Sequence, residues 1–411
     1  MGISIIETNR YSLHPFNGRK YWGIVQKVIL ENTSENSLIL DPFMGSGTTI
    51  IESLILNRKV IGVDVTPLSH FIVTETLKNI TIDKLNLEFK NINLLKPIFF
   101  KLYKSKECCN CCGSNLIVYS FVINNFTSFF CPKCNSIIKK NTPPNFILNS
   151  FDDFNYNNKY IPNNKIPANF NSNVNFIKDL YSQRNLIGLC LLLEFIDKIK
   201  CEDVKNYFKF IFSSNLGKSS KLNILKNNNR WKTINTFKVP EVYVNFNIWF
   251  GFLNKIKKAI DLKCEINKFN LDLNHLQLIL DDSKNLNLKN NLVDCIICDP
   301  PYYKDISYAC NSYLHLSWIN LNYLNKFNFD SLDIMDSKTF DENLLCIFKN
   351  CFKILKKDGF FVLILSNISV DYTESLINIL NKSNFILISK MFSKEFDLLD
   401  YVILKFKKKN I

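Results

Sequence analysis

The apolar and polar positions of the chain give a sheet-like pattern near the N-terminus. Short apolar runs stand at LILD (38–41) and KVIGVDV (59–65), and the apolar pattern IIESLIL (50–56) between them has helical spacing. The order strand, helix, strand is typical of the first unit of a parallel α/β sheet. We therefore predict an α/β fold that begins at about residue 38.

Sheet-like runs return only in the last third of the chain. They are HLQLILDD (275–282), LVDCIICD (292–299), GFFVLIL (359–365), NFILISKMF (384–392) and LDYVILKFK (399–407). Between the two sheet regions, residues 176–265 have a mainly helical pattern. Residues 141–175 are rich in Asn, Pro and Phe and show no clear period, which indicates a loop or an extended cover.

We predict one mostly parallel, Rossmann-like α/β domain that is interrupted by an insert. Residues 1–98 and 271–411 supply its two halves, residues 99–140 hold a cysteine cluster, and residues 141–270 form a mainly helical segment. The alternative is two sequential α/β domains. Each half alone has too few strands to bury both faces of a sheet, which favours the single interrupted domain.

The composition of the chain bears on its partners and on its cellular compartment. The 411 residues carry a formal net charge of +14, which suggests an acidic partner such as nucleic acid, although a solvated basic surface is the plainer alternative. No apolar run reaches the length of a membrane span, and the N-terminus lacks the pattern of a signal peptide. We expect a cytoplasmic protein without a membrane partner, whose 14 cysteines serve as thiols and metal ligands.

The cysteine cluster has the spacing of a tetrahedral zinc site. ECCNCCGSN (107–115) and CPKC (131–134) each contain a C-x-x-C pair, with 18 residues between Cys112 and Cys131. In the first stretch Cys108 with Cys111 and Cys109 with Cys112 are both in register. We prefer Cys109, Cys112, Cys131 and Cys134, because Gly113 and Asn135 then follow each pair and suit a left-handed turn. A redox dithiol or incidental cysteines are the alternatives.

The turn PFMGSGTT (42–49), between the first strand and its helix, is a candidate ligand site. Gly45 and Gly47 allow a ligand close to the backbone, and a helix N-terminus offers free N–H groups. No Lys follows Gly47 as in a P-loop, and position 50 is Ile where a dinucleotide fingerprint has Gly. Asp64, at the end of the second strand, is placed to hold ribose hydroxyls. We expect a nucleoside-type cofactor without a pyrophosphate; an ordinary βα turn is the alternative.

Three motifs together resemble a known enzyme family. DPFMGSGTT (41–49), VIGVDV (60–65) and DPPY (299–302) look like the S-adenosylmethionine (SAM)-dependent amino-methyltransferases of DNA, which methylate adenine N6 or cytosine N4. LHPFNGRKYW (13–22) is similar to the segment that precedes their cofactor strand. DPPYYKDISYACNSYLHLSW (299–318) with the cysteine cluster resembles, more narrowly, the adenine-specific methylases that contain a zinc ribbon.

The resemblance implies a role for individual residues. It assigns the binding of S-adenosyl-L-methionine to Asp41, Phe43, Gly45, Gly47, Thr48, Asp64 and Asp282. Within LILDDSKNLNL (278–288), Asp282 is the expected contact to the cofactor adenine, and Asp281 is the alternative. The resemblance places methyl transfer on Asp299, Pro300, Pro301 and Tyr302. In this family the acid and the first proline carbonyl accept the amine hydrogens, the tyrosine stacks on a flipped base, and the four cysteines hold a structural Zn²⁺.

The expected function is methylation of adenine N6 in DNA, since cytosine-N4 enzymes often carry Ser at the position of Asp299. Cytosine N4, RNA or a protein amide as substrate, and a zinc-ribbon nucleic-acid-binding protein with an inactive transferase site, remain alternatives. Arg184, Arg230 and Trp231 of the helical segment are candidates for DNA contact. A paired restriction endonuclease is compatible with this function, and the sequence specifies no oligomeric state. Cys295 and Cys298 also form a C-x-x-C, but we interpret them as core residues.

Overall fold

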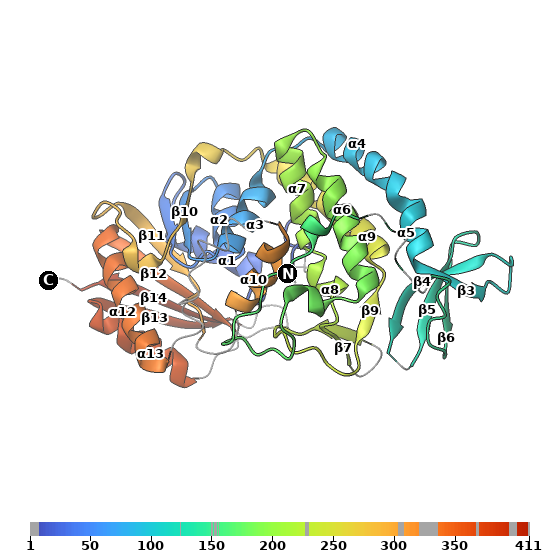
Figure 1. Ribbon diagram of the computed structural model, residues 1–411. Helices are drawn as coiled ribbons and strands as arrows, with labels where there is room; N and C mark the ends of the chain where they lie inside the picture. Colours follow the sequence, from blue (N-terminus) through green and yellow to red (C-terminus); the bar gives the residue numbers. More distant parts are fainter. Residues whose placement is uncertain are drawn as a thin grey trace.

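A computed structural model describes most of the chain: residues 8–123, 125–148, 151, 154, 156–226, 230–302, 308–319, 336–366, 370–393 and 401–409. Residues 303–307 of the predicted catalytic stretch and residues 227–229 of a basic stretch lie outside the described residues. Figure 1 shows three regions in a row, with a sheet flanked by helices at one end, a group of helices in the middle and an antiparallel ribbon at the other end.

The sheet joins the two halves of the predicted α/β domain. Its order is β10 (Leu276–Leu280), β2 (Lys59–Asp64), β1 (Leu38–Asp41), β11 (Val293–Cys298), β12 (Leu355–Ser366), β14 (Tyr401–Lys408) and β13 (Phe385–Ser393). The first five strands are parallel, and β14 pairs antiparallel with both β12 and β13. β1 lies beside β11 although 251 residues separate the two strands along the chain (from Asp41 to Val293). The predicted α/β, mostly parallel and interrupted sheet is confirmed.

Helices cover both faces of this sheet. One face packs against α1 (Trp22–Asn32), α2 (Thr48–Ile55), α3 (Pro67–Leu77) and α10 (Tyr308–Ile319), and the other packs against α12 (Ser337–Ile354) and α13 (Val370–Lys382). Cys295 and Cys298 are buried in the cores on opposite faces, as strand alternation requires. Both are therefore core residues, as predicted.

The middle region is mainly helical, as its pattern indicated. Its helices are α4 (Ile82–Ile92), α5 (Lys96–Tyr103), α6 (Gln183–Asp197), α7 (Glu202–Ser213), α8 (Leu216–Ser219) and α9 (Ile248–Ile266), with a hairpin of β7 (Asn223–Lys226) and β8 (Arg230–Thr233). One continuous hydrophobic core runs from the face of the sheet into these helices. The division of the chain at residues 98, 140 and 270 remains a prediction, because this shared core does not separate the two regions.

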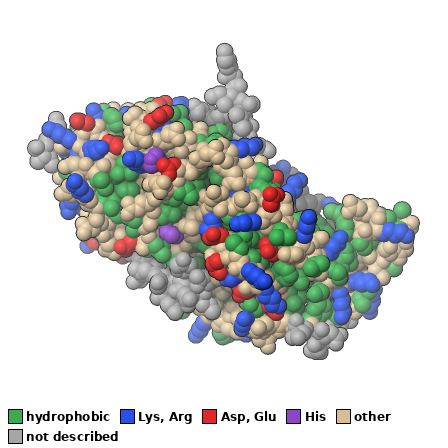
Figure 2. Space-filling view, turned by 90° about the horizontal axis from the view of Figure 1, so that it is seen from above, with side chains coloured by type: hydrophobic (Ala, Val, Ile, Leu, Met, Phe, Trp, Pro, Cys, Tyr) green, Lys and Arg blue, Asp and Glu red, His purple; other side chains and the backbone are tan. Residues whose placement is uncertain are grey.

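The ribbon is an antiparallel sheet of β3 (Lys104–Cys108), β4 (Asn115–Val122), β5 (Thr127–Cys131) and β6 (Ser136–Lys140), to which β9 (Val244–Phe246) is added beside β4. The predicted strand–turn–strand between the cysteine pairs is present as β4 and β5. In Figure 2 basic and acidic side chains are interspersed over the main body, whereas basic ones predominate at the ribbon end on the right. Among the helices that the structure describes, none is long and apolar enough to cross a bilayer.

Candidate active site and four-cysteine cluster

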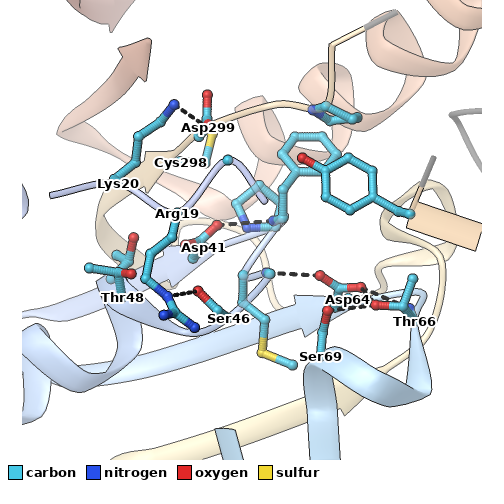
Figure 3. Close-up of a pocket in the computed structure, with 18 of the residues that line it drawn as sticks. Arg19, Lys20, Asp41, Ser46, Thr48, Asp64, Thr66, Ser69, Cys298 and Asp299 are labelled. Carbon is cyan, nitrogen blue, oxygen red and sulfur yellow. Dashed lines mark hydrogen bonds and ion pairs between the residues drawn. The ribbon is translucent and has the colours of Figure 1, made fainter. Parts of the chain in front are cut away.

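The carboxyl ends of β1, β2 and β11 meet at one edge of the sheet and line a single cavity (Figure 3). Ligands of open α/β sheets bind at this edge, where the chain order of neighbouring strands reverses. Of the predicted cofactor residues, Asp41, Phe43, Gly45, Thr48, Asp64 and Asp282 line the cavity. Asp299 and Pro301 of the predicted catalytic set line it too.

Both glycines of the turn after β1 take left-handed conformations. Gly45 has φ 49° and Gly47 has φ 80°. Gly47 does not line the cavity. A Cβ there would lie 2.4 Å from Cγ2 of Val73 on α3, so this glycine lets the turn pack against that helix.

Asp64 ties the turn to the end of β2. Its carboxylate accepts from the backbone N–H of Gly45 at 2.8 Å, and from both the N–H and the hydroxyl of Thr66 at 2.8 and 2.5 Å. Burial raises the pKa of Asp64, and these hydrogen bonds oppose the shift. The residue thus shapes the cavity as well as offering a carboxylate to it.

Asp41, the last residue of β1, and Asp282, which follows β10, line the same cavity. Asp41 accepts from the N–H of Phe43 at 3.0 Å, and burial raises its pKa to about 7. Asp282 accepts from the N–H of Lys284 at 2.9 Å. Asp281, the alternative adenine contact, is exposed and is not among the residues that line the cavity.

Asp299 is held by two groups that local sequence patterns did not reveal. Its Oδ2 forms a 2.6 Å ion pair with Nζ of Lys20, and its Oδ1 accepts from the hydroxyl of Tyr302 at 2.7 Å. Lys20 also donates to Tyr302 at 2.8 Å and to the hydroxyl of Ser366 at 2.7 Å. Burial raises the pKa of Asp299 to about 6, while attraction and hydrogen bonding to Lys20 lower it. The pKa of this carboxyl therefore lies close to neutral pH. The Asp299 side chain is 19% exposed and lines the cavity.

The two prolines and Tyr302 occupy different surroundings. The Pro301 carbonyl accepts from the hydroxyl of Tyr372 at 2.7 Å. Among the hydrogen bonds between described residues, none ends on the Pro300 carbonyl. Tyr302 is only 9% exposed and its ring meets that of Tyr372 edge-on at 5.7 Å, so the stacking of Tyr302 on a base remains a prediction.

The segment that delivers Lys20 is fixed by long-range contacts. His14 Nε2 is 3.0 Å from the hydroxyl of Ser213 on α7, and the guanidinium of Arg19 donates to the carbonyl of His14 at 3.0 Å and to the hydroxyl of Ser46 at 3.0 Å. Lys20 itself is buried. The only sequence signal for it was the motif LHPFNGRKYW, whose resemblance gave no role to the lysine.

The candidate DNA contacts in the helical segment differ from one another. Arg184 donates to the carbonyls of Leu102 and Leu148 and stacks over the ring of Phe146 at 3.7 Å. It is an internal brace, and its proposed DNA contact is not supported by this placement. Trp231 is 42% exposed and Arg230 is exposed, both on β8.

The four preferred cysteines converge where β3 turns into β4 and β5 turns into β6. Their Sγ atoms all lie within 4.8 Å of one another, with 3.8 Å between Cys109 and Cys134 and 3.5 Å between Cys112 and Cys131. Zn–S bonds of about 2.3 Å in a tetrahedron place the sulfurs about 3.8 Å apart, so the cluster fits that ion. Cys108 and Cys111 are exposed outside it.

The two turns that carry these cysteines have the same local structure. The N–H of Gly113 donates to the carbonyl of Cys109 and that of Asn135 to the carbonyl of Cys131, each at 2.9 Å. Gly113 and Asn135 have φ 67° and 54°. The left-handed positions expected after each pair are therefore confirmed.

Comparison with known proteins agrees with the N-terminal part of this site. Residues 7–71 match the model of a family described as DNA methylase. Type II methyltransferase M2.LlaDCHI of Lactococcus lactis subsp. cremoris is 49% identical over 51 residues, 12% of this chain and 18% of that protein. Type II methyltransferase M.MjaII of Methanocaldococcus jannaschii is 31% identical over 75 residues, 18% of this chain and 14% of that protein. The chain thus spans less than a fifth of the length of these relatives.

Among solved structures, a TehB-like SAM-dependent methyltransferase from Corynebacterium glutamicum aligns with 95% of this chain and 90% of its own, at a TM-score of 0.30 and 7% identity. A likeness at that level says nothing about function. Residues 7–71 are thus similar to the N6/N4 DNA methylase family, and short segments of the chain match type II methyltransferases.

Proposed function

We propose that this protein is a SAM-dependent DNA methyltransferase that modifies the exocyclic N6 of adenine. The observation that carries the proposal is the common cavity, which Asp299 at the end of β11 shares with the glycine turn and Asp64. A cofactor held by the glycine turn would therefore lie beside the carboxylate of Asp299, which directly follows β11. Because the matches cover only a small part of the relatives, the activity, the substrate and the partners of the whole chain all belong to this proposal.

The cavity suits the cofactor by its donors and acceptors. Asp64 and Asp282 offer carboxylates to ribose hydroxyls and adenine, and the positive-φ glycine at 45 lets a ligand approach the backbone closely. When bound there, S-adenosyl-L-methionine supplies an activated methyl group on its sulfonium.

The chain's own residues would then manage the hydrogens of the target amine. Each oxygen of Asp299 keeps a lone pair beyond the one used by Lys20 or Tyr302, and the Pro300 carbonyl has no described donor. These acceptors can align an amine with two N–H groups. A carboxylate with a pKa of about 6 is also suited to take up the proton that the methylated nitrogen must lose.

Adenine is favoured by the residue type at 299, in keeping with the resemblance stated above. DNA is favoured by the matched family and by the net charge of +14. If six phosphates were contacted, affinity would fall roughly a thousandfold between low and moderate salt.

The test is to incubate the protein with labelled SAM and duplex DNA, digest the DNA to nucleosides, and identify the product by mass and retention. We expect N6-methyladenine, and none with Asp299→Ala. N4-methylcytosine would reject the base, and transfer to RNA alone would reject the substrate class. Bound SAM without any transfer would support the nucleic-acid-binding alternative.

We further propose that Cys109, Cys112, Cys131 and Cys134 hold one structural Zn²⁺ per chain. The support is the convergence of their four Sγ atoms. The second support is a backbone N–H at Cys134 that donates to Sγ of Cys131 at 3.3 Å, since such bonds stabilise a thiolate. Metal analysis of protein purified without chelators tests it.

A further inference from the structure

Four cationic side chains from three separate segments lie near the catalytic corner, by which we mean Lys20, Asp299, Tyr302 and Ser366. The cations are Arg19 of the N-terminal segment, Lys218 of α8, and Lys255 and Lys258 of α9. Each is partly exposed, neither fully buried nor free on the surface. Among the described residues, no carboxylate lies within ion-pairing distance of any of the four.

Two of these cations contact the same short stretch of the N-terminal segment. Nζ of Lys255 donates to the carbonyl of Leu13 at 2.5 Å, and Arg19 donates to the next carbonyl, that of His14, at 3.0 Å. The two cations thus hold consecutive peptide groups. Arg19 is followed in the chain by Lys20, which pairs with Asp299.

Lys218 lies at the β7–β8 hairpin. Nζ of Lys218 is 4.7 Å from the ring centroid of Phe246 and 5.2 Å from that of Trp231. The two rings contact each other at 4.8 Å, and Trp231 is 42% exposed. An exposed aromatic ring therefore borders Lys218.

Within the described parts of the chain, no ion pair offsets the repulsion between these cations. Burial lowers the pKa of Lys255 to about 7, and Lys258, Lys218 and Arg19 lower it further by repulsion. The pKa of Lys218 is lowered by burial and by Lys258. Like charges that are gathered without counter-ions raise the free energy of the protein alone, and a polyanion laid along them would lower it.

We propose that Arg19, Lys255, Lys258 and Lys218 form a strip that binds the phosphodiester backbone of the DNA strand carrying the target base. This inference rests on the proposed function for the identity of the polyanion. Successive phosphates would bind to the lysines and Arg19, and the target nucleotide next to them would reach Asp299. Trp231 would contact a base or sugar at the other end of the strip. One strand of a duplex offers a phosphate charge about every 3.4 Å of axis, which suits several closely spaced cations.

The test neutralises the three lysines together as Lys218→Gln, Lys255→Gln and Lys258→Gln. We expect the dependence of affinity on salt to weaken: the magnitude of the slope of log affinity for a target duplex against log salt should decrease by about 2 to 3. We also expect KM for DNA to rise about tenfold or more, with SAM affinity within a few-fold of the parent.

Two further variants keep the test sharp. A triple Lys→Arg variant at 218, 255 and 258 retains the charges and should restore the slope, which separates charge from folding. Lys84→Gln, Lys90→Gln and Lys382→Gln remove the same number of exposed charges from α4 and α13, and should leave KM unchanged.

The outcomes separate the strip from the reaction. If the parent methylates DNA but neutralisation at 218, 255 and 258 matches the control variant in slope and KM, the strip is wrong and the reaction stands. If the parent transfers no methyl group to DNA but the slope still falls on neutralisation, the strip stands and the proposed reaction is wrong.

Discussion

The ribbon and the catalytic corner are both small sites built from few side chains, but they are assembled in different ways. The ribbon brings together four cysteines that lie between residues 109 and 134, on two turns of the same kind. The corner joins Lys20, Asp299, Tyr302 and Ser366, which span most of the chain. Local spacing specifies the first site, whereas the second exists only once β11, β12 and the N-terminal segment are packed together.

This difference implies different responses to substitution. Loss of one cysteine should affect the fold of the ribbon and leave the distant corner intact. Loss of a residue in the corner should affect chemistry or cofactor binding while the ribbon keeps its metal. The following substitutions test that separation, from the largest expected effect to the smallest.

Asp299→Ala should abolish methyl transfer, by about a thousandfold or more, because it removes the acceptor at the target amine. SAM affinity should stay within a few-fold, since the proposed role of Asp299 is toward the target amine and not toward the cofactor. Single-turnover methylation and equilibrium SAM binding measure the two quantities. Substantial remaining activity would contradict the assigned mechanism.

Cys112→Ser should eliminate bound zinc and destabilise the ribbon by several kcal/mol, because metal binding contributes directly to the folding of such modules. Metal content and thermal unfolding provide the measurement. Cys108→Ser is the matched control, since this thiol is exposed outside the cluster, and it should retain one zinc per chain. Loss of zinc from that control would mean that the other register binds the metal.

Lys20→Met should lower kcat roughly 10- to 100-fold, because Asp299 loses the partner that orients it. The pH dependence should change as well. Protonation removes the acceptor, so activity of the parent falls as pH drops through about 6. Lys20 holds that pKa down, so without it the acid limb should move to higher pH. A pH–rate profile that keeps its midpoint in the variant would argue against this positioning role.

Asp64→Ala should weaken SAM binding about tenfold or more, because a ribose contact and the brace of the glycine turn are lost together. The rate at saturating SAM should change much less. Titration calorimetry with SAM measures the loss. Asp281→Ala serves as the comparison, because this exposed carboxylate does not line the cavity, and weakening there would favour Asp281 over Asp282 as the adenine contact.

The sequence predicted more of the sheet than of the helical region. The central strands β1, β2, β11 and β12 contain compact apolar runs, because strands buried on both faces need uninterrupted apolar residues. It did not anticipate α4 and α5, or that β9 joins the ribbon beside β4. Strand addition from a distant segment depends on an available sheet edge, which no local pattern encodes.

The sequence alone determined the elements whose physics is local. The glycine turn, the two cysteine turns and the end of β11 at Asp299-Pro300 follow from residue types at fixed offsets, where only certain backbone conformations are accessible. Tertiary structure alone decided the ion pair of Lys20 with Asp299, the inward position of Arg184 and the gathering of four cations beside the corner. The reason is range: a side chain's charge and hydrogen bonds act on whatever packing brings within a few ångströms, however distant it is along the chain.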